Sequence, residues 1–299
     1  TKIYYRYYEK LAFWFLPITI GLLALVFTPL GVAAKGATRW LALGPITFQP
    51  SELIKLTFII YLAAWLGRRL ERQKSFWKGF VPFFVATTII AALLLEQPAT
   101  STAVILIAVA LIVYFASGAK LSYILSSIVV GGIGLLLVIY LTQYRWDRIV
   151  NFFEPSDLAA GGFHLNQALI AIGSGGLTGV GYGQSTTKIS YLPEPAGDSI
   201  FAVIAEEFGF IGSSLLLGVF LILIMKMFFL SRNYPDKFGQ LLLIGFGTLI
   251  ALQAFVHIGA ISGLLPLTGT PLPFISYGGT ALAVFMTMGG IIVNISKYA

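Results

Sequence analysis

The 299-residue chain is 58% hydrophobic and only 10% charged, and its mean hydropathy is +0.89. A soluble domain carries about 25% charged residues, so this composition excludes a soluble globular protein and predicts a polytopic membrane protein. The formal charge of +7 does not indicate nucleic-acid binding, because the basic residues fall mostly in short connections between apolar runs. The chain has no cysteine, which excludes disulfide and thiolate chemistry.

The apolar runs predict an all-α, polytopic membrane helix bundle with about eight transmembrane helices, since each crossing needs about 20 apolar residues. The predicted spans are roughly 11–31, 51–67, 80–96, 100–117, 121–141, 199–230, 240–264 and 277–296. The span that begins at Ser199 is longer than a bilayer requires, so we expect it to tilt or to project beyond the lipid. We expect residues 1–299 to form a single transmembrane domain that includes an outer loop over 142–198. The chain opens with Thr1 rather than methionine, and we expect further residues upstream.

The basic residues predict the orientation. One set of connections holds about 13 of the 19 Lys and Arg residues, and the opposite set contains Lys35, Arg39, Arg145, Arg148 and Lys188. Because short cytoplasmic connections carry the excess of Lys and Arg, the first set is predicted to be cytoplasmic. The polar residues of the connections over 31–52, 96–102, 142–198 and 268–279 are therefore predicted to face outward.

Glu52 and Lys55 follow a helix start at Pro50-Ser51 and stand three residues apart, on one face of the predicted helix. Two interpretations remain open. The pair neutralises itself inside a buried helix, or one of the two side chains faces a cavity and serves the substrate or a catalytic base.

Two short amphipathic helices are predicted at the start of the outer loop, over 142–155 and 163–172. In the first, Arg145 and Arg148 are three apart and share a helical face. Its aromatic residues Trp146, Phe152 and Phe153 suit a helix that lies in the headgroup layer.

The glycine-rich stretch from Gly173 to Gly183 matches neither the dinucleotide-binding fingerprint nor the P-loop. It is either a flexible outer connection or a functional loop, and the polar cluster Gln184, Ser185 and Lys188 favours the second interpretation.

Asp198 stands at the start of a long apolar helix. An aspartate there is typical of an N-cap, which satisfies free backbone N–H groups. It also suits a general base at the rim of a lipid-facing cavity, and the two interpretations are compatible. For the acids inside the helix, Glu206 and Glu207, we expect structural pairing, with at least one directed into the bundle.

No metal site built by the protein is predicted, because His164 and His257 are far apart in the sequence and have no partner at ligand spacing. A Ser-His-Asp arrangement is not found either.

Five motifs, in the right order along the whole chain, resemble the SEDS family, which comprises RodA, FtsW and SpoVE. They are GATRW…FQPSE, YR-x-x-R-x-x-x-F, AIGSGGL-x-G-x-G-x-GQS-x-x-K, D-x-IFAVIAEE-x-G and GLLP-x-x-G-x-PLPFISYGG. The closing Asn294-Ile295-Ser296 is more like FtsW than RodA. Two positions depart from the family pattern: an acidic residue is missing at Ala99-Thr100, and the usual His-Thr before the aspartate is Ala196-Gly197 here.

The resemblance implies ten spans, of which this chain would supply the last eight. It also implies a glycosyltransferase of the bacterial cytoplasmic membrane that polymerises lipid II into peptidoglycan at the outer face, in division or elongation. The matching residues imply Asp198 as general base. The substrate-binding residues we expect are Arg39, Glu52, Lys55, Arg145, Arg148, Gln184, Ser185 and Lys188. A divalent cation, Mg²⁺ or Mn²⁺, would arrive with the substrate pyrophosphate, and the expected partners are membrane lipid and a class B penicillin-binding protein.

Two other function classes remain. A lipid II flippase needs a hydrophilic path across the whole bilayer, whereas the polar residues here gather in the outer half. A non-catalytic scaffold that recruits a transpeptidase needs only surfaces, and it would leave Asp198, Lys188 and Arg148 dispensable.

Overall fold

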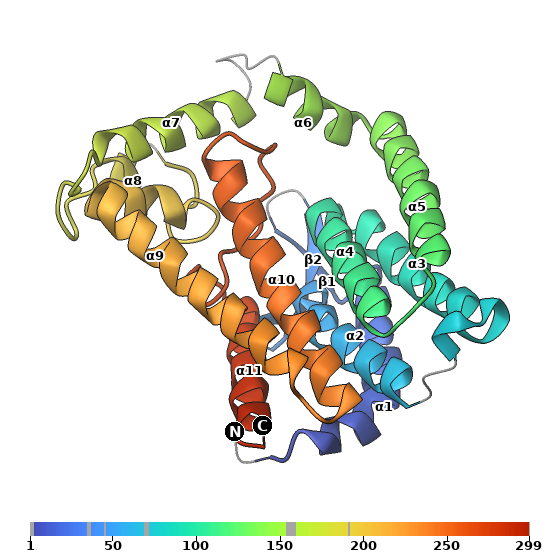
Figure 1. The fold of residues 1–299 in the computed structure, drawn as a ribbon. Helices are drawn as coiled ribbons and strands as arrows, with labels where there is room; N and C mark the ends of the chain where they lie inside the picture. Colours follow the sequence, from blue (N-terminus) through green and yellow to red (C-terminus); the bar gives the residue numbers. More distant parts are fainter. Residues whose placement is uncertain are drawn as a thin grey trace. The chain divides into compact units, whose positions relative to one another are not determined.

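The computed structural model of the chain describes residues 3–34, 37–44, 46–68, 72–153, 160–190 and 192–298. It separates into two compact units. Unit 1 comprises Thr1–Ser127, Ile224–Ile250 and Gly279–Ala299, and unit 2 comprises Ile128–Leu223 and Ala251–Gly278. Three of the boundaries between the units fall within the sequence of helices α5, α9 and α10, which are labelled in Figure 1. The expectation of a single domain stays a prediction.

All eight predicted spans are helices. Seven helical segments among the described residues are long and apolar enough to cross a membrane, and the 17-residue α4 is a shorter apolar helix. The bilayer therefore explains why apolar side chains cover most of these helices on all sides. Their bounds are α1 Arg6–Leu25, α2 Pro50–Gly67, α3 Val81–Glu96, α4 Thr100–Ala116, α5 Leu121–Leu141, α9 Ile200–Arg232, α10 Lys237–Ile261 and α11 Gly279–Ser296. A 3₁₀ turn at Arg72–Lys74 and a π-helical turn at Phe76–Phe80 lead into α3.

Helix α2 is the centre of unit 1. Its span is 83% buried, and its Ile54, Phe58 and Leu62 are almost fully enclosed. The first half of α10 packs directly on it: a Cβ at Gly245 would stand only 2.5 Å from the Cγ2 atom of Ile59. Helix α2 also carries the buried polar residues Ser51, Glu52 and Lys55, and such residues in a membrane segment face the interior of the bundle.

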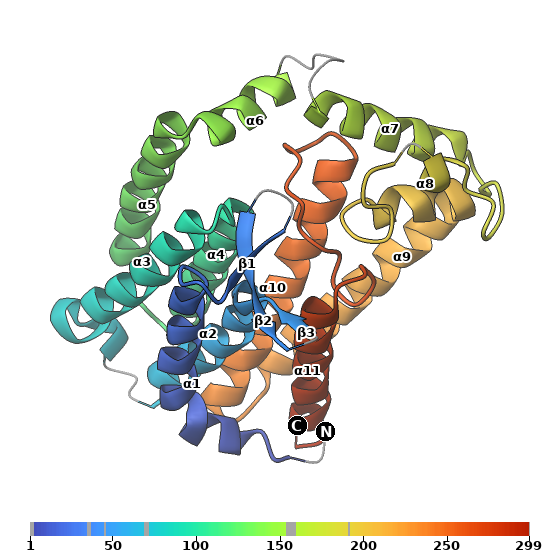
Figure 2. The same ribbon diagram turned by 180° about the vertical axis from the view of Figure 1, so that it is seen from behind.

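The link between α1 and α2 is a three-stranded antiparallel sheet, which the sequence analysis did not predict (Figure 2). Its strands are β1 Gly31–Ala34, β2 Ala37–Leu43 and β3 Ile46–Phe48, with Val32 opposite Trp40 and Ala42 opposite Thr47. Small residues and a β-bulge between Val32 and Ala33 interrupt the alternation of polar and apolar residues that would have indicated strands.

Unit 2 contains the short helices α6 Gln143–Phe153, α7 Ala160–Ser174 and α8 Thr187–Ser190, together with parts of α5, α9 and α10. The first two confirm the predicted amphipathic helices of the outer loop. Buried residues of α7, α9 and α10 form its apolar core, among them Ala168, Ala171, Ala202 and Ile261.

Helix α9 is broken at Gly209, whose φ of 65° and ψ of −163° lie outside the helical region. The 23 residues from 210 to 232 are then sufficient for one crossing, at 1.5 Å per residue. The break thus divides the long span into two segments, and its tilt or projection beyond the lipid stays a prediction.

The glycine-rich segment packs against this break through its backbone. Phe210 N donates to Gly176 O at 2.9 Å and Ile211 N to Leu177 O at 3.1 Å, while Val180 N and Gly181 N donate to the carbonyls of Glu206 and Glu207. These bonds replace the helical ones that are lost at Gly209. The segment is therefore an ordered partner of α9, and the flexible-connection interpretation is wrong.

We predict that Gly209→Ala destabilises the protein by at least about 2 kcal/mol, because its backbone angles are accessible almost only to glycine. In addition, a Cβ there would stand 2.3 Å from Gly179 N. Gly218→Ala in the same helix is the matched control, since its Cβ would meet nothing within 4 Å, and its effect should stay within about 1 kcal/mol. Thermal unfolding in detergent measures both, and equal melting temperatures for the two variants would contradict the explanation.

Candidate functional site

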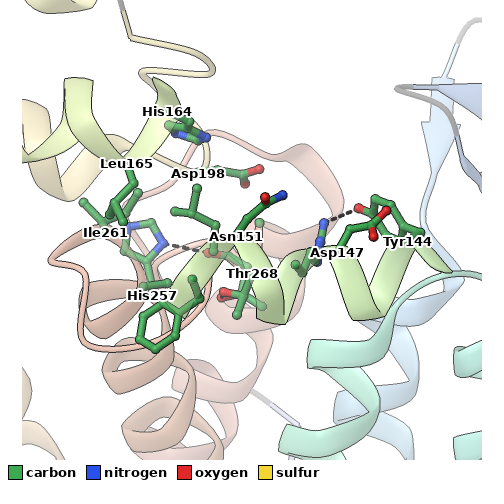
Figure 3. A pocket seen from close by; sticks show the side chains of 15 residues that line it. Tyr144, Asp147, Asn151, His164, Leu165, Asp198, His257, Ile261 and Thr268 are labelled. Atoms are coloured by element: carbon green, nitrogen blue, oxygen red, sulfur yellow. Dashed lines mark hydrogen bonds between the residues drawn. The ribbon is translucent and has the colours of Figure 1, made fainter. Parts of the chain in front are cut away.

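A cavity of about 420 Å³ lies within unit 2 and contains Asp198 (Figure 3). Side chains converge on it from α6, α7, the second half of α10, the turn before α9 and the loop after α10. The described lining residues are Tyr144, Asp147, Arg148, Asn151, Phe152, His164, Leu165, Asp198, His257, Ala260, Ile261, Leu267, Thr268, Gly269 and Thr270. Apolar walls with a few convergent polar groups are typical of a ligand site.

Asp198 is positioned through the backbone of its own turn. Tyr277 N donates to Ala196 O at 2.8 Å, and Ser276 Oγ donates to Gly197 O at 2.8 Å. The loop that supplies these donors is itself fixed, because Gln253 of α10 donates to Pro271 O at 2.9 Å. The motif PLPFISYGG thus holds the residues on the N-terminal side of Asp198.

The Asp198 carboxylate is half-buried and accepts no hydrogen bond from the residues that the structure describes. The N-cap interpretation is therefore wrong: Ser199, not Asp198, immediately precedes α9. Gly269, at a φ of +60°, approaches the carboxylate so closely that a Cβ would stand 3.1 Å from Asp198 Oδ2. A carboxylate that faces a cavity without a partner is free to accept a proton or a hydroxyl hydrogen bond.

Of the basic residues predicted to bind substrate, only Arg148 is among the described residues that line this cavity. Its guanidinium lies over the Tyr144 ring, 4.6 Å from the centroid, and donates to the Tyr144 hydroxyl. The neighbouring Asp147 accepts from Gln143 Nε2 at 2.8 Å. Arg145 instead donates to Thr142 Oγ1 at 2.8 Å. Phe152, which we expected in the headgroup layer, lines the cavity.

The two histidines, 93 positions apart in the sequence, meet in the cavity. His164 Nε2 lies 2.7 Å from Ser199 Oγ, and that hydroxyl donates to Pro193 O at 2.7 Å. Burial lowers the pKa of His164 below its ordinary value, and the negative charge of Asp198 opposes that shift. The fully buried His257 bonds through Nδ1 to Thr270 O at 2.6 Å, while its Nε2 has no hydrogen-bond partner among the described residues.

The cluster of Ser185 and Lys188 contacts the acids of α9. Lys188 Nζ lies 2.5 Å from Glu207 Oε1, and Glu206 accepts from Ser185 Oγ at 2.5 Å and from the Thr187 hydroxyl. This confirms the expected structural pairing of Glu206 and Glu207. Gln184 is exposed. Binding of substrate by Gln184, Ser185 and Lys188 stays a prediction, and none of the three is among the described lining residues.

The remaining predicted residues belong to unit 1. Glu52 and Lys55 form a buried ion pair, with Lys55 Nζ 2.7 Å from Glu52 Oε1, while Glu52 Oε2 has no hydrogen-bond partner among the described residues. Arg39 donates to Gln97 O at 2.9 Å and to Pro98 O at 2.5 Å, which ties β2 to the end of α3. These contacts give Glu52, Lys55 and Arg39 structural partners, and their roles toward substrate stay predictions.

No group of three or more His, Asp or Glu side chains that could hold a metal ion is found in the described ranges. A divalent cation carried by the substrate stays a prediction.

We predict that Lys188→Met destabilises the protein by about 1–3 kcal/mol, because it leaves the Glu207 carboxylate buried without its cation. The double variant Lys188→Met/Glu207→Gln should recover most of that loss, which unfolding in detergent would measure as a double-mutant cycle. Additive effects of the two substitutions would argue against structural pairing and would leave Lys188 available to a ligand.

The comparisons with known proteins agree with this fold. The family model for cell cycle proteins of the FtsW/RodA/SpoVE type matches residues 1–299. A probable peptidoglycan glycosyltransferase FtsW of Geobacter sp. (strain M18) is 38% identical, over 95% of this chain and 78% of that protein. The stage V sporulation protein E of Bacillus subtilis (strain 168) is 35% identical, over 94% of this chain and 78% of that protein.

Two solved structures share the fold. A chain of a peptidoglycan synthase complex, described as coordinating polymerization and crosslinking, matches with a TM-score of 0.81 and 28% identity, covering 99% of this chain and 84% of that chain. The rod shape determining protein RodA of Thermus thermophilus matches with a TM-score of 0.69 and 28% identity, covering 98% of this chain and 79% of that chain. The protein therefore belongs to the FtsW/RodA/SpoVE family, as the sequence motifs predicted, and it is a polytopic membrane protein.

Proposed function

We propose that this protein is a peptidoglycan glycosyltransferase that polymerises lipid II, with Asp198 as the general base. The class of activity follows from the family, because relatives of this chain are named as probable peptidoglycan glycosyltransferases. The observation that supports the role of Asp198 is a half-buried carboxylate without a hydrogen-bond partner among the described residues, in a cavity that also contains Arg148.

In the proposed reaction, the 4-hydroxyl oxygen of the acceptor sugar attacks the anomeric carbon of the donor. The bond from that carbon to the pyrophosphate oxygen breaks, the configuration inverts, and polyprenyl pyrophosphate leaves. Asp198 takes the proton of the attacking hydroxyl, a role worth typically about 10²–10⁴-fold in rate. The cavity volume of about 420 Å³ lies within the range of small-ligand sites, so the sugars at the reaction centre would occupy it while the polyprenyl tail stays with the lipid.

Arg148 is the cation best placed to stabilise the negative charge that develops on the leaving pyrophosphate. Its bond to the Tyr144 hydroxyl and its packing on that ring hold the guanidinium in one orientation before substrate arrives. A preorganised cation stabilises the transition state without reorganisation at the moment of reaction. A divalent cation bound to the pyrophosphate, Mg²⁺ or Mn²⁺, would supplement it, because phosphates commonly carry such ions into active sites.

The site would face the outside of the bacterial cytoplasmic membrane, where lipid II is polymerised. The distribution of Lys and Arg supports that orientation. The proposed partner is a class B penicillin-binding protein, which is a transpeptidase. This proposal is supported by the similarity of the fold to a chain of a peptidoglycan synthase complex.

Asp198→Asn should lower polymerisation of purified lipid II by at least about 10²-fold while the protein still inserts and folds, because the amide cannot take up the proton. Glycan strands made in detergent with Mg²⁺ or Mn²⁺ are the measurement. The matched control is Asp147→Asn, which changes a carboxylate of the same cavity that already accepts from Gln143, and it should cost less than about 10-fold. Full activity of Asp198→Asn would remove this residue from the mechanism and favour a scaffold or a flippase.

Arg148→Gln should lower the same activity by about 10²-fold, since a neutral side chain cannot stabilise the developing charge, and Arg148→Lys should retain part of it. Arg145→Gln is the comparison, because Arg145 is predicted to bind substrate but is not among the described lining residues. A larger loss in Arg145→Gln than in Arg148→Gln would contradict the assignment of the pyrophosphate to Arg148.

A further inference from the structure

A chain of two hydrogen bonds joins α7 to the turn that carries Asp198. The Ser199 hydroxyl has one hydrogen, and it donates that hydrogen to the carbonyl of Pro193 at 2.7 Å. The contact between Ser199 Oγ and His164 Nε2, also 2.7 Å, therefore needs its hydrogen from the histidine. His164 consequently carries a proton on Nε2, and in its neutral form its Nδ1 has a free lone pair.

We infer that His164 is a positioning residue for Asp198: its Nε2–H fixes the turn from Pro193 to Ser199, and its protonation lowers the activity of the base. The inference rests on the proposed function, since it concerns the same carboxylate. From the sequence, His164 was not predicted to position Asp198.

The geometry separates two effects of His164. The first is mechanical: Pro193 and Ser199 flank the turn, so the bond from His164 to Ser199 fixes the backbone on the C-terminal side of Asp198. The loop residues Ser276 and Tyr277 fix Gly197 and Ala196 on its other side. The bond from Nε2 exists in both the neutral and the charged imidazole, so protonation leaves the mechanical effect in place.

The second effect is electrostatic, because protonation at Nδ1 places a positive charge beside Asp198 in the same cavity. That charge stabilises the carboxylate and makes it a weaker base. The charged and titratable groups that line the cavity with His164 are Asp198 on the turn before α9, Tyr144, Asp147 and Arg148 on α6, and His257 on α10. Burial lowers the pKa of His164 and Asp198 raises it, with burial the larger effect, so the imidazole is neutral at pH 7 and charges only below its ordinary range.

The direction of the pH dependence follows. As the pH falls, the unfolded chain takes up the proton before the folded chain does, so acidification removes stability as well as activity. The variant His164→Gln separates the mechanical effect from the electrostatic effect. Its amide N–H can replace the Nε2–H donor to Ser199, but the amide does not titrate.

Nuclear magnetic resonance tests the tautomer directly, since the chain has only two histidines. In protein labelled with ¹⁵N-histidine, we expect His164 as the Nε2–H form at about pH 7.5, whereas His257, whose Nδ1 faces the Thr270 carbonyl, should be the Nδ1–H form. The variant His257→Asn assigns the two signals. A Nδ1–H tautomer at His164 would overturn the inference.

The kinetic test compares wild type, His164→Gln, His164→Ala and Ser199→Ala in lipid II polymerisation between about pH 5.5 and pH 7.5. At about pH 7.5 we expect His164→Gln to remain within about 3-fold of wild type, and the two alanine variants to lose about 10-fold. At about pH 5.5 the wild-type rate should have fallen by less than about 10-fold, because burial keeps part of His164 neutral there, and the rate of His164→Gln should have fallen by clearly less than that of wild type.

Two outcomes of the kinetic test overturn the inference: His164→Gln follows the wild-type pH profile, or it is as inactive as His164→Ala at neutral pH. Asp198→Asn, assayed in parallel, keeps this failure distinct from failure of the proposed function. An active Asp198→Asn contradicts the general base itself, whereas an inactive Asp198→Asn together with a wild-type profile for His164→Gln contradicts only the role of His164.

Discussion

The proposed function places one constraint on the candidate site: a carboxylate that must stay free to take a proton cannot be held by hydrogen bonds to its own oxygens. Asp198 meets it because its backbone neighbours are held instead. Donors from Ser276 and Tyr277 bond to the carbonyls before Asp198, and Ser199 after it bonds to Pro193. The loop after α10 and the turn before α9 therefore form one element of the candidate site. Gly269 belongs to it as well, because its φ of +60° favours glycine and a Cβ there would stand only 3.1 Å from Asp198 Oδ2.

The other acids near the start of α9 show the opposite arrangement. Glu206 and Glu207 are buried, and each accepts bonds from the polar residues that follow the glycine-rich segment. The glycines are needed because the two backbones approach closely: a Cβ at Gly175 or Gly179 would stand about 2 Å from a carbonyl oxygen of α9. The paired acids bond to the segment that packs against the break in the helix, and the acid without a partner is the one that the proposed mechanism uses as a base.

The sequence predicted the features that follow from length and composition. All eight apolar helices, the two amphipathic helices and the pairing of Glu206 and Glu207 were predicted, since each depends on local pattern or on the cost of burying charge. The strands β1–β3 were not predicted, because their short segments lack a regular alternation of polar and apolar residues. The sequence also did not predict that His164, His257 and Asp198 line one cavity. Spacing rules describe residues on one helix face, whereas these three residues come from three different elements. The break at Gly209 was missed because one glycine among apolar residues is common in membrane helices.

The charges of the cavity also bear on the substrate. Among its described lining residues, two carboxylates, Asp147 and Asp198, stand against one guanidinium, Arg148, and His164 is neutral at pH 7. A bare pyrophosphate would meet a slight excess of negative charge, and only the first of the two carboxylates is partly compensated, by Gln143. In the proposed function, a divalent cation bound to the pyrophosphate would remove this conflict, because its charge would offset both the substrate and the acids around it.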